Sequence, residues 1–292
     1  MGLKIYIFGS GSAGQRYYHL AKKNGLEPYF LRDSDQSTIE RESQLYSCLH
    51  WEQVERGNYV VIADQTYRRK ANYDRVKLLA PEILLIEKPI YYNRDTRNSL
   101  DALVPEMQSI KTGDQYFFDD LLQKYGESET GRQIKIDYID YIGNITKGNI
   151  NSYAVSQDGG GAKWTLTHTL FVSLLFLTKK FAFINYDSIS ILQYRDEKKI
   201  AIYKFEYKGY EFLITVKFSE QPSDKIFQLV DNAGCLVDFN GRKIFKDGNF
   251  YYKSDFSRTD LIEKTFLTNS MSEMRDQFYL SYKTCQLLGS IS

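Results

Sequence analysis

A glycine-rich turn directly after an apolar run is the feature that most constrains the fold of this chain. The run Lys4–Phe8 leads into three glycines spaced as G-x-G-x-x-G. At this spacing the first glycine allows a tight turn out of a strand, the second lets a pyrophosphate approach the backbone, and the third lets the next helix pack closely. The helix N-terminus then offers free N–H groups to the phosphates. The residues of this turn predicted to bind a dinucleotide are Gly9, Gly11, Ser12, Ala13 and Gly14.

An acidic residue after the next apolar run supports a dinucleotide site. Asp33 follows Tyr29–Leu31, where dinucleotide-binding domains carry the carboxylate that binds the ribose hydroxyls. The alternative for Asp33 is an exposed turn residue. The neighbouring Arg32 could instead accept the 2′-phosphate of NADP. The cofactor is therefore expected to be NAD or NADP, with NAD favoured.

Length and composition indicate a globular protein and argue against several classes. The 292 residues suit roughly two domains. With 38 basic and 37 acidic residues the net charge is +1, so neither nucleic acid nor an anionic membrane is an expected partner. No apolar run has the length of a membrane span and no signal-peptide pattern is present, which predicts a cytoplasmic location. Asp114, Asp119 and Asp120 have no histidine or cysteine close in sequence, and no metal site is expected.

The hydrophobic periodicity changes between the two halves of the chain. In the first half, short apolar runs alternate with helical stretches, as in parallel strands joined by helices. In the second half, longer strands are separated by tight turns, and such strands must be antiparallel. The expected strands are Lys4–Phe8, Pro28–Leu31, Tyr59–Ala63, Ile83–Ile86, Ser188–Tyr194, Lys199–Tyr207, Tyr210–Phe218, Ile226–Val230 and Cys235–Phe239. The expected helices include Gln15–Asn24, Thr66–Leu79 and Trp164–Lys180.

These patterns predict two domains of different class. We expect an α/β Rossmann domain over residues 1–118 that binds the dinucleotide. An α+β domain with an open, mainly antiparallel sheet should follow over residues 119–292.

Further motifs follow the glycine turn along the chain. The strand end Val60–Ala63 comes first, a Glu-Lys-Pro motif at 87–89 follows the fourth apolar strand, and the triplet Gly159–Gly161 precedes His168. Together with the glycine turn, these blocks resemble the Gfo/Idh/MocA family, the glucose–fructose oxidoreductase and inositol dehydrogenase group of NAD(P)-dependent sugar enzymes. The resemblance covers essentially the whole chain.

The resemblance implies an enzyme that transfers a hydride to or from a sugar, a nucleotide sugar or a related polyol. By analogy, Lys88 is the catalytic lysine and His168 is the histidine opposite it. Both residue types can be tuned to move the proton that accompanies hydride transfer at an alcohol carbon. The glycine block is similar to a branch associated with surface-polysaccharide sugars. The family also implies that the second domain, residues 119–292, provides the substrate site and the subunit contacts of a homodimer or homotetramer. Further residues expected beside the cofactor are Ala63, Glu87 and Lys88, and those expected near the substrate are Lys163, Thr165 and Tyr116.

Two departures from the family pattern leave alternatives open. Relatives usually carry an aspartate one turn before the histidine, where this chain has Thr165, and many have a histidine where it has Arg69. A catalytically silent homologue that binds dinucleotide or sugar is therefore the rival hypothesis, and a biliverdin-reductase-like activity ranks last. The alternative for His168 is a core histidine, and Lys163 could equally be a solvated helix residue and Tyr116 a packing aromatic.

Overall fold

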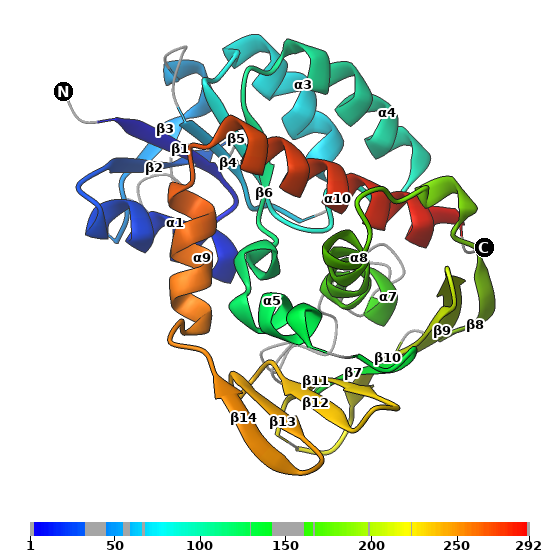
Figure 1. Ribbon diagram of the computed structural model, residues 1–292. Coiled ribbons are helices and arrows are strands. Elements are labelled where there is room, and N and C mark those ends of the chain that lie inside the picture. Colours follow the sequence, from blue (N-terminus) through cyan, green and yellow to red (C-terminus); the bar gives the residue numbers. More distant parts are fainter. Residues whose placement is uncertain are drawn as a thin grey trace. The chain divides into compact units, whose positions relative to one another are not determined.

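The chain divides into two compact units in the computed structural model (Figure 1). The structure describes residues 3–32, 45–54, 59–65, 68–128, 130–141, 161–165, 167–197, 199–222 and 224–290. The first unit comprises Met1–Gly113 and Glu263–Tyr279, and the second comprises Asp114–Ile262 and Leu280–Ser292. The sequence suggested a single boundary near residue 118 and contained no signal that the chain returns to the first unit.

The first unit is built on a six-stranded sheet in which every strand pair is parallel. Its order is β3-β2-β1-β4-β5-β6, so the direction of winding reverses between β1 and β4. This is the doubly wound order, in which ligands bind at the carboxyl ends of the strands beside the reversal. The strands are β1 Lys4–Phe8, β2 Glu27–Arg32, β3 Cys48–His50, β4 Tyr59–Ile62, β5 Ile83–Ile86 and β6 Ile110–Thr112.

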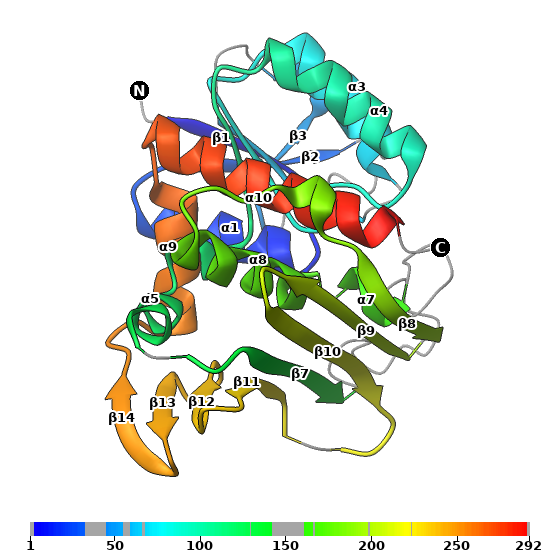
Figure 2. The same ribbon diagram turned by 45° about the vertical axis from the view of Figure 1, so that its right-hand side comes forward.

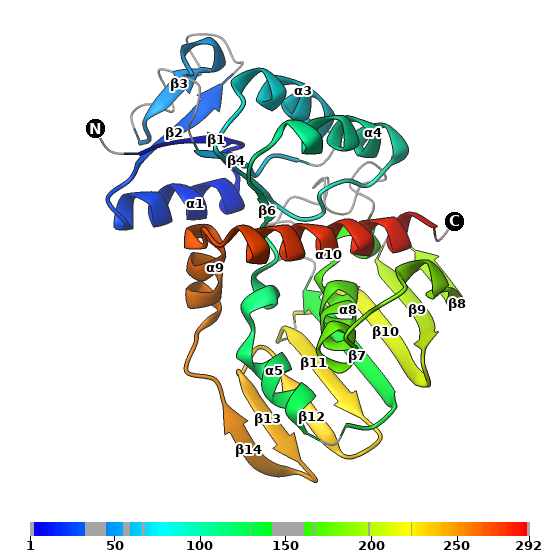
Figure 3. The same ribbon diagram turned by 45° about the horizontal axis from the view of Figure 1, so that its top comes forward.

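Helices cover both faces of this sheet, which explains why its central strands are almost wholly apolar. Figure 3 shows α1 on one face and α3 and α4 on the other. These helices are α1 Ser12–Lys23, α3 Arg69–Leu79 and α4 Arg94–Leu103.

The C-terminal part of the chain supplies a further piece of the first unit. This piece, Glu263–Tyr279, contains the C-terminal part of α9 Arg258–Leu267 and the N-terminal part of α10 Met271–Ser290. Phe266, which is fully buried, stacks on Tyr59 with 5.3 Å between ring centroids, and the Tyr59 hydroxyl donates to the Phe266 carbonyl at 2.9 Å. Lys111 Nζ donates to the carbonyls of Phe266 and Thr268 at 2.6 and 2.8 Å. These contacts fix the C-terminal end of α9 against the strands.

The second unit is built on an eight-stranded sheet that is mainly antiparallel, as predicted. Its order is β14-β13-β12-β11-β7-β10-β9-β8, and only the β7–β10 pair is parallel among the strand pairs of the described residues. Both central residues of the β9–β10 turn, Lys208 and Gly209, have positive φ (48° and 80°), which is the geometry of a two-residue hairpin. The strands are β7 Gln133–Tyr141, β8 Ile191–Glu197, β9 Ile200–Tyr207, β10 Tyr210–Ser219, β11 Ile226–Asp231, β12 Cys235–Asp238, β13 Lys243–Lys246 and β14 Asn249–Lys253.

One face of the second sheet is covered by helices (Figure 2). These are α5 Asp120–Glu127, α7 Gly161–Thr165 and α8 His168–Lys180. Along β10 the residues Phe212, Ile214 and Val216 are buried, whereas Leu213 and Lys217 between and beyond them are exposed. The alternation identifies the helix-covered side as the core face. None of the helices in the described part of the chain has the length and apolarity to cross a membrane.

The single helix expected over Trp164–Lys180 is wrong. α7 ends at Thr165 and α8 begins at His168, with Thr167 as the residue that precedes it. The continuous apolar pattern misled the prediction because both helices are buried and no proline or glycine marks the division. Thr165 and His168 therefore do not lie one turn apart on one helix.

Candidate functional site

The glycine turn has the geometry that its spacing predicted. β1 ends at Phe8, and Gly9 follows with φ of 94°, a conformation that favours glycine. A Cβ at Gly9 would lie 2.7 Å from Asp64 Cα, so the turn passes directly against the chain that follows β4. A Cβ at Gly14 would lie 1.8 Å from the Gly9 carbonyl oxygen, so only glycine lets α1 pack onto the turn.

Gly11 differs from the other two glycines because the space beside it is open. It is exposed, its φ of −64° suits any residue, and a Cβ there would meet nothing within 4 Å in the described structure. A steric requirement inside the chain therefore does not explain this glycine. Its absent side chain leaves room for a ligand to approach the backbone, the role that the second glycine has in dinucleotide sites.

The N-terminus of α1 is electrostatically suited to an anion. The helix begins at Ser12 and Ala13, has no acidic residue in its first turn, and receives no side-chain cap from Gly11. Because the first turn has no acidic residue, no carboxylate of the helix competes for the positive end of its dipole. Lys22 and Lys23 lie in the last turn, at the negative end. This end of α1 can hold a phosphate.

The ends of β4 and β5 adjoin the glycine turn. The Ala63 N–H donates to the Phe8 carbonyl at 2.9 Å, and the Glu87 N–H donates to the Ile62 carbonyl at 2.9 Å. Ala63, Glu87 and the half-buried Lys88 therefore lie at the same edge of the sheet as the turn. The structure thus brings together every described residue predicted for the cofactor.

The Glu87 carboxylate is held by its own chain. Tyr17 donates its hydroxyl proton to Glu87 Oε1 at 2.7 Å, and the Lys88 N–H donates to Glu87 Oε2 at 3.1 Å. Burial, and next the Glu87 charge, raise the pKa of Tyr17 well above its usual range, so this phenol stays a donor. A Cβ at Gly113 would lie 2.8 Å from the Glu87 carboxyl carbon, so a side chain at this position would displace the hydrogen-bonded pair. The arrangement fixes the backbone from which Lys88 extends.

Lys88 itself follows β5 directly. Its peptide bond to Pro89 is cis. Its carbonyl oxygen accepts a long hydrogen bond, 3.5 Å, from Nη2 of Arg69. The sequence analysis assigned no site role to Arg69, Tyr17 or Gly113. Of these, only Arg69 had a signal in the sequence, because many members of the family have a histidine at this position.

In the second unit, His168 lies in an aromatic cluster. It is the first residue of α8 and is 4% exposed. Its ring stacks on Tyr116 with 5.6 Å between centroids and meets the rings of Tyr138 at 4.7 Å and Phe227 at 5.2 Å. The predicted residues Tyr116 and His168 are therefore in contact.

Burial raises the pKa of Tyr116 to about 12, although the charge of Arg258 acts in the opposite direction. The Tyr116 phenol is consequently protonated at neutral pH and offers a hydrogen-bond donor next to His168.

The remaining predicted substrate residues lie on α7. Lys163 is 7% exposed, and its Nζ lies 5.7 Å from the centre of the Trp164 ring. Thr165 is the last residue of the helix. The predicted ribose ligand Asp33 and the first two glycines of the triplet, Gly159 and Gly160, lie outside the described residues.

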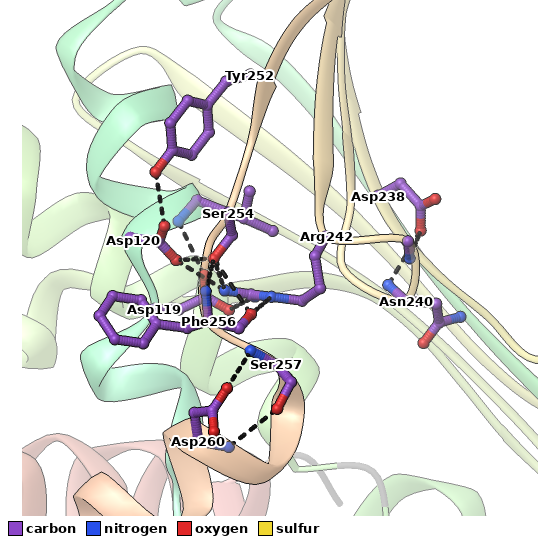
Figure 4. Close-up of polar contacts among 12 residues, drawn as sticks. Asp119, Asp120, Asp238, Asn240, Arg242, Tyr252, Ser254, Phe256, Ser257 and Asp260 are labelled. Atoms are coloured by element: carbon purple, nitrogen blue, oxygen red, sulfur yellow. Dashed lines mark hydrogen bonds and ion pairs between the residues drawn. The ribbon is translucent and has the colours of Figure 1, made fainter.

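Two of the three aspartates considered as metal ligands, Asp119 and Asp120, belong to an ion-pair network (Figure 4), whereas Asp114 accepts a hydrogen bond from Ser281. Arg242 donates from Nη1 to Asp119 at 2.5 Å and from Nη2 to Asp120 at 2.7 Å, and Ser254 and Tyr252 also donate to Asp120. Burial raises the pKa of Asp119, partly offset by Arg242. These carboxylates tie α5 to the strands β13 and β14. No cluster of metal-ligating side chains occurs among the residues that the structure describes.

Comparison with known proteins identifies the fold. No protein-family model and no curated protein sequence matches the chain. Among solved structures, the WlbA (WbpB) dehydrogenase from Thermus thermophilus, in complex with NAD and UDP-GlcNAcA, is 13% identical with a TM-score of 0.67, and the match covers 98% of this chain and 94% of that one. A putative myo-inositol dehydrogenase from Sinorhizobium meliloti 1021 is 14% identical with a TM-score of 0.66, covering 98% and 95% of the two chains.

A third match shows that the fold does not select one substrate. The biliverdin reductase from Synechocystis sp. PCC 6803, in complex with biliverdin and NADP+, is 10% identical with a TM-score of 0.67, covering 99% of this chain and 97% of that one. At such identities the likeness establishes architecture, and function must be argued from the site. The chain has the two-domain fold of the Gfo/Idh/MocA dehydrogenases.

Proposed function

We propose that this protein is a nicotinamide-dinucleotide-dependent oxidoreductase that transfers a hydride to or from a sugar, a nucleotide sugar or a related polyol. The observation that carries the proposal is the open Gly11 backbone between two sterically required glycines, at the carboxyl edge of a sheet of order 3-2-1-4-5-6. An uncapped helix N-terminus at this edge suits a pyrophosphate. Similar structures solved with NAD or NADP+ support the same class of cofactor.

Lys88 and His168 are the proposed catalytic residues. Hydride transfer at an alcohol carbon needs a proton to leave or reach the oxygen, and Lys88 would hold that oxygen and move the proton. His168 would orient the substrate together with the protonated Tyr116 hydroxyl beside it. Lys163 and Thr165 are proposed to contact the substrate. The dinucleotide itself would supply or accept the hydride.

A binding experiment tests the cofactor assignment. Calorimetry should detect binding of NAD or NADP to the wild-type protein, and Gly11→Val should abolish it without unfolding the protein, because the branched side chain enters space that the chain leaves empty. No binding to the wild type at millimolar concentration would remove the assignment.

The ribose carboxylate decides between the two cofactors. Asp33→Ala should weaken NAD more than NADP, because a carboxylate bonds the free ribose hydroxyls and repels a 2′-phosphate. Equal losses for both dinucleotides would contradict the proposed role of Asp33 and the preference for NAD.

The rival hypothesis is a silent homologue that binds a dinucleotide or sugar as a sensor or assembly partner. It is favoured by Thr165, which has no carboxylate, and by the tight aromatic packing of His168.

An enzyme should lose turnover roughly 100-fold or more in Lys88→Ala with little change in dinucleotide affinity. His168→Ala should also reduce turnover. A wild type that binds dinucleotide but turns over neither sugars nor biliverdin would favour the silent homologue, and turnover insensitive to Lys88→Ala would reject the catalytic lysine.

Two finer points belong to the same proposal. We assign the substrate to the sugars of surface polysaccharides, because the glycine block is similar to that branch. We also propose a homodimer or homotetramer, assembled through the helix-free face of the second sheet.

A further inference from the structure

Arg69 is a buried charge with no counter-ion among the described residues of its unit. It is the first residue of α3 and only 3% exposed. Its Nη2 donates to the carbonyls of Asp64 and Lys88, both at 3.5 Å, whereas Nε and Nη1 meet no acceptor in the described structure. Because a guanidinium keeps its proton in proteins, this side chain is a cation with most of its donors unused.

The nearby carboxylates do not neutralise it. Asp64 Oδ1 accepts from the Gln65 N–H at 2.7 Å, and Asp64 Oδ2 lies 4.0 Å from Arg68 Nη1. Both oxygens of Glu87 accept from Tyr17 and Lys88. The carboxylates at the ends of β4 and β5 are thus engaged with other donors.

The N-terminus of α3 adds positive potential at the same point. The helix is 11 residues long, has no acidic residue in its first turn, and its cap residue Arg68 provides no side-chain cap. The positive end of the helix dipole therefore lies at the residue that carries the guanidinium. Burying an uncompensated charge is strongly unfavourable unless a partner of opposite sign is bound. Two independent features, the buried donors of Arg69 without acceptors and the helix end without a side-chain cap, favour the same kind of partner, an anion.

We propose that Arg69 and the N-terminus of α3 bind an anionic group of the substrate, a carboxylate or a phosphate, next to Lys88. The proposal rests on the oxidoreductase function above and narrows its substrate class to acidic sugars. The phosphates of the dinucleotide are proposed to bind at a different element, the N-terminus of α1 after β1. The hydrogen bond from Arg69 to the Lys88 carbonyl, at 3.5 Å, puts this anion site beside the residue proposed to transfer the proton.

The test measures stabilisation and affinity in the full chain. Inorganic phosphate and glucuronate are titrated into the wild type and into Arg69→Met, with chloride at matched ionic strength, and followed by thermal unfolding and calorimetry. Both anions should stabilise the wild type in proportion to the logarithm of concentration above the dissociation constant. Affinity should fall about 10- to 100-fold in Arg69→Met, as expected for lost hydrogen bonds to a charged group. Without anion, Arg69→Met should melt higher than wild type, because an unpaired buried charge is removed.

The neighbouring arginine is the matched control. Arg68 precedes Arg69, but its side chain is 59% exposed. Arg68→Met should keep the full response to phosphate and glucuronate. If Arg69→Met does not fold, Arg69→Lys keeps the charge without the planar donors and should bind both anions more weakly than wild type. Equal responses in wild type and the Arg69 variant, or no response in the wild type, would overturn the proposal.

NAD and NADP titrations on the same samples separate this proposal from the function on which it rests. If NAD binds normally but the anions have no effect, the proposed Arg69 site is rejected and the oxidoreductase function stands. If no dinucleotide binds, the proposed oxidoreductase function is rejected. If Arg69→Met weakened NADP but neither NAD nor glucuronate, the anion would be the cofactor's 2′-phosphate and the substrate assignment would be wrong. With NAD bound, glucuronate should bind more tightly than the neutral glucose in wild type, and this difference should vanish in Arg69→Met.

Discussion

Gly11 and Gly14 lie three residues apart, yet a methyl group would have opposite consequences at the two positions. At Gly14 it would overlap the Gly9 carbonyl oxygen, so Gly14→Ala must displace α1 and should cost about 3 kcal/mol of unfolding free energy. Gly11→Ala should change that free energy by less than about 0.5 kcal/mol, because the position is exposed and its φ is unstrained. Urea denaturation measures both values.

The pair separates a packing glycine from a ligand glycine. Dinucleotide binding should weaken in Gly11→Ala while its stability stays at the wild-type value. A stability loss in Gly11→Ala as large as in Gly14→Ala would show that both glycines serve packing, and would remove the observation on which the proposed function depends.

The structural setting of a site residue could be predicted from the sequence only where it depends on residues nearby in the chain. The geometry of the glycine turn and the position of Lys88 at the end of β5 were predictable because both depend on a few neighbouring residues, whereas the catalytic role of Lys88 stays a prediction from the family resemblance. Tyr17 and Gly113 were not, because each acquires its role through Glu87, which is distant from both along the chain. Arginine usually lies on the surface of a helix, and only the fold shows that Arg69 is buried.

At the scale of elements, Lys111 holds the C-terminal end of α9 from inside the protein. Burial lowers its pKa from 10.5 to about 7, although the two carbonyls that it contacts favour the charged form. Between about pH 7 and 10.5 the unfolded chain therefore binds a proton at Lys111 that the folded chain releases. By linkage, this residue makes folding more favourable as pH rises through that interval, and the contribution is lost as pH falls through 7.

Lys111→Met should remove this pH dependence. The difference in unfolding free energy, wild type minus variant, should increase from pH 7 to 10 when measured by denaturation at a series of pH values. Lys70→Met, at an exposed position on α3, is the control and should leave the slope unchanged. A difference that stays flat would mean that Lys111 keeps its ordinary pKa in the folded protein.

Element prediction succeeded where burial left a simple pattern. β1 and β5 match the predicted ranges, because strands covered on both faces appear as unbroken apolar runs. β7 was missed: it carries charged residues on alternate positions, including the Lys135–Asp137 ion pair at 2.9 Å, within a segment whose neighbours in the sheet come from far along the chain. The division between α7 and α8 has no local mark and depends on tertiary packing.

At the scale of the whole molecule, the helix-free face of the second sheet is the proposed subunit contact. Leu213 and Ile226 lie on it, and each is 38% exposed. Leu213→Glu should shift a dimer or tetramer toward monomer in sedimentation velocity, because a charge would be buried at the contact. Leu78→Glu on α3, at a residue 62% exposed, should leave the assembly intact. A monomeric wild type, or a Leu213→Glu variant that assembles normally, would contradict this contact.

The return of Glu263–Tyr279 to the first unit sets an order of events during synthesis. The strands and helices that carry the glycine turn leave the ribosome early, but the ring that stacks on Tyr59 and the carbonyls that receive Lys111 are translated only after the entire second sheet. Until then, the Tyr59 ring and the Lys111 side chain of the nascent first unit stay exposed to water. Ribosome-bound chains that stop before Phe266 should therefore be digested by protease within the first unit, and those that extend past Tyr279 should resist.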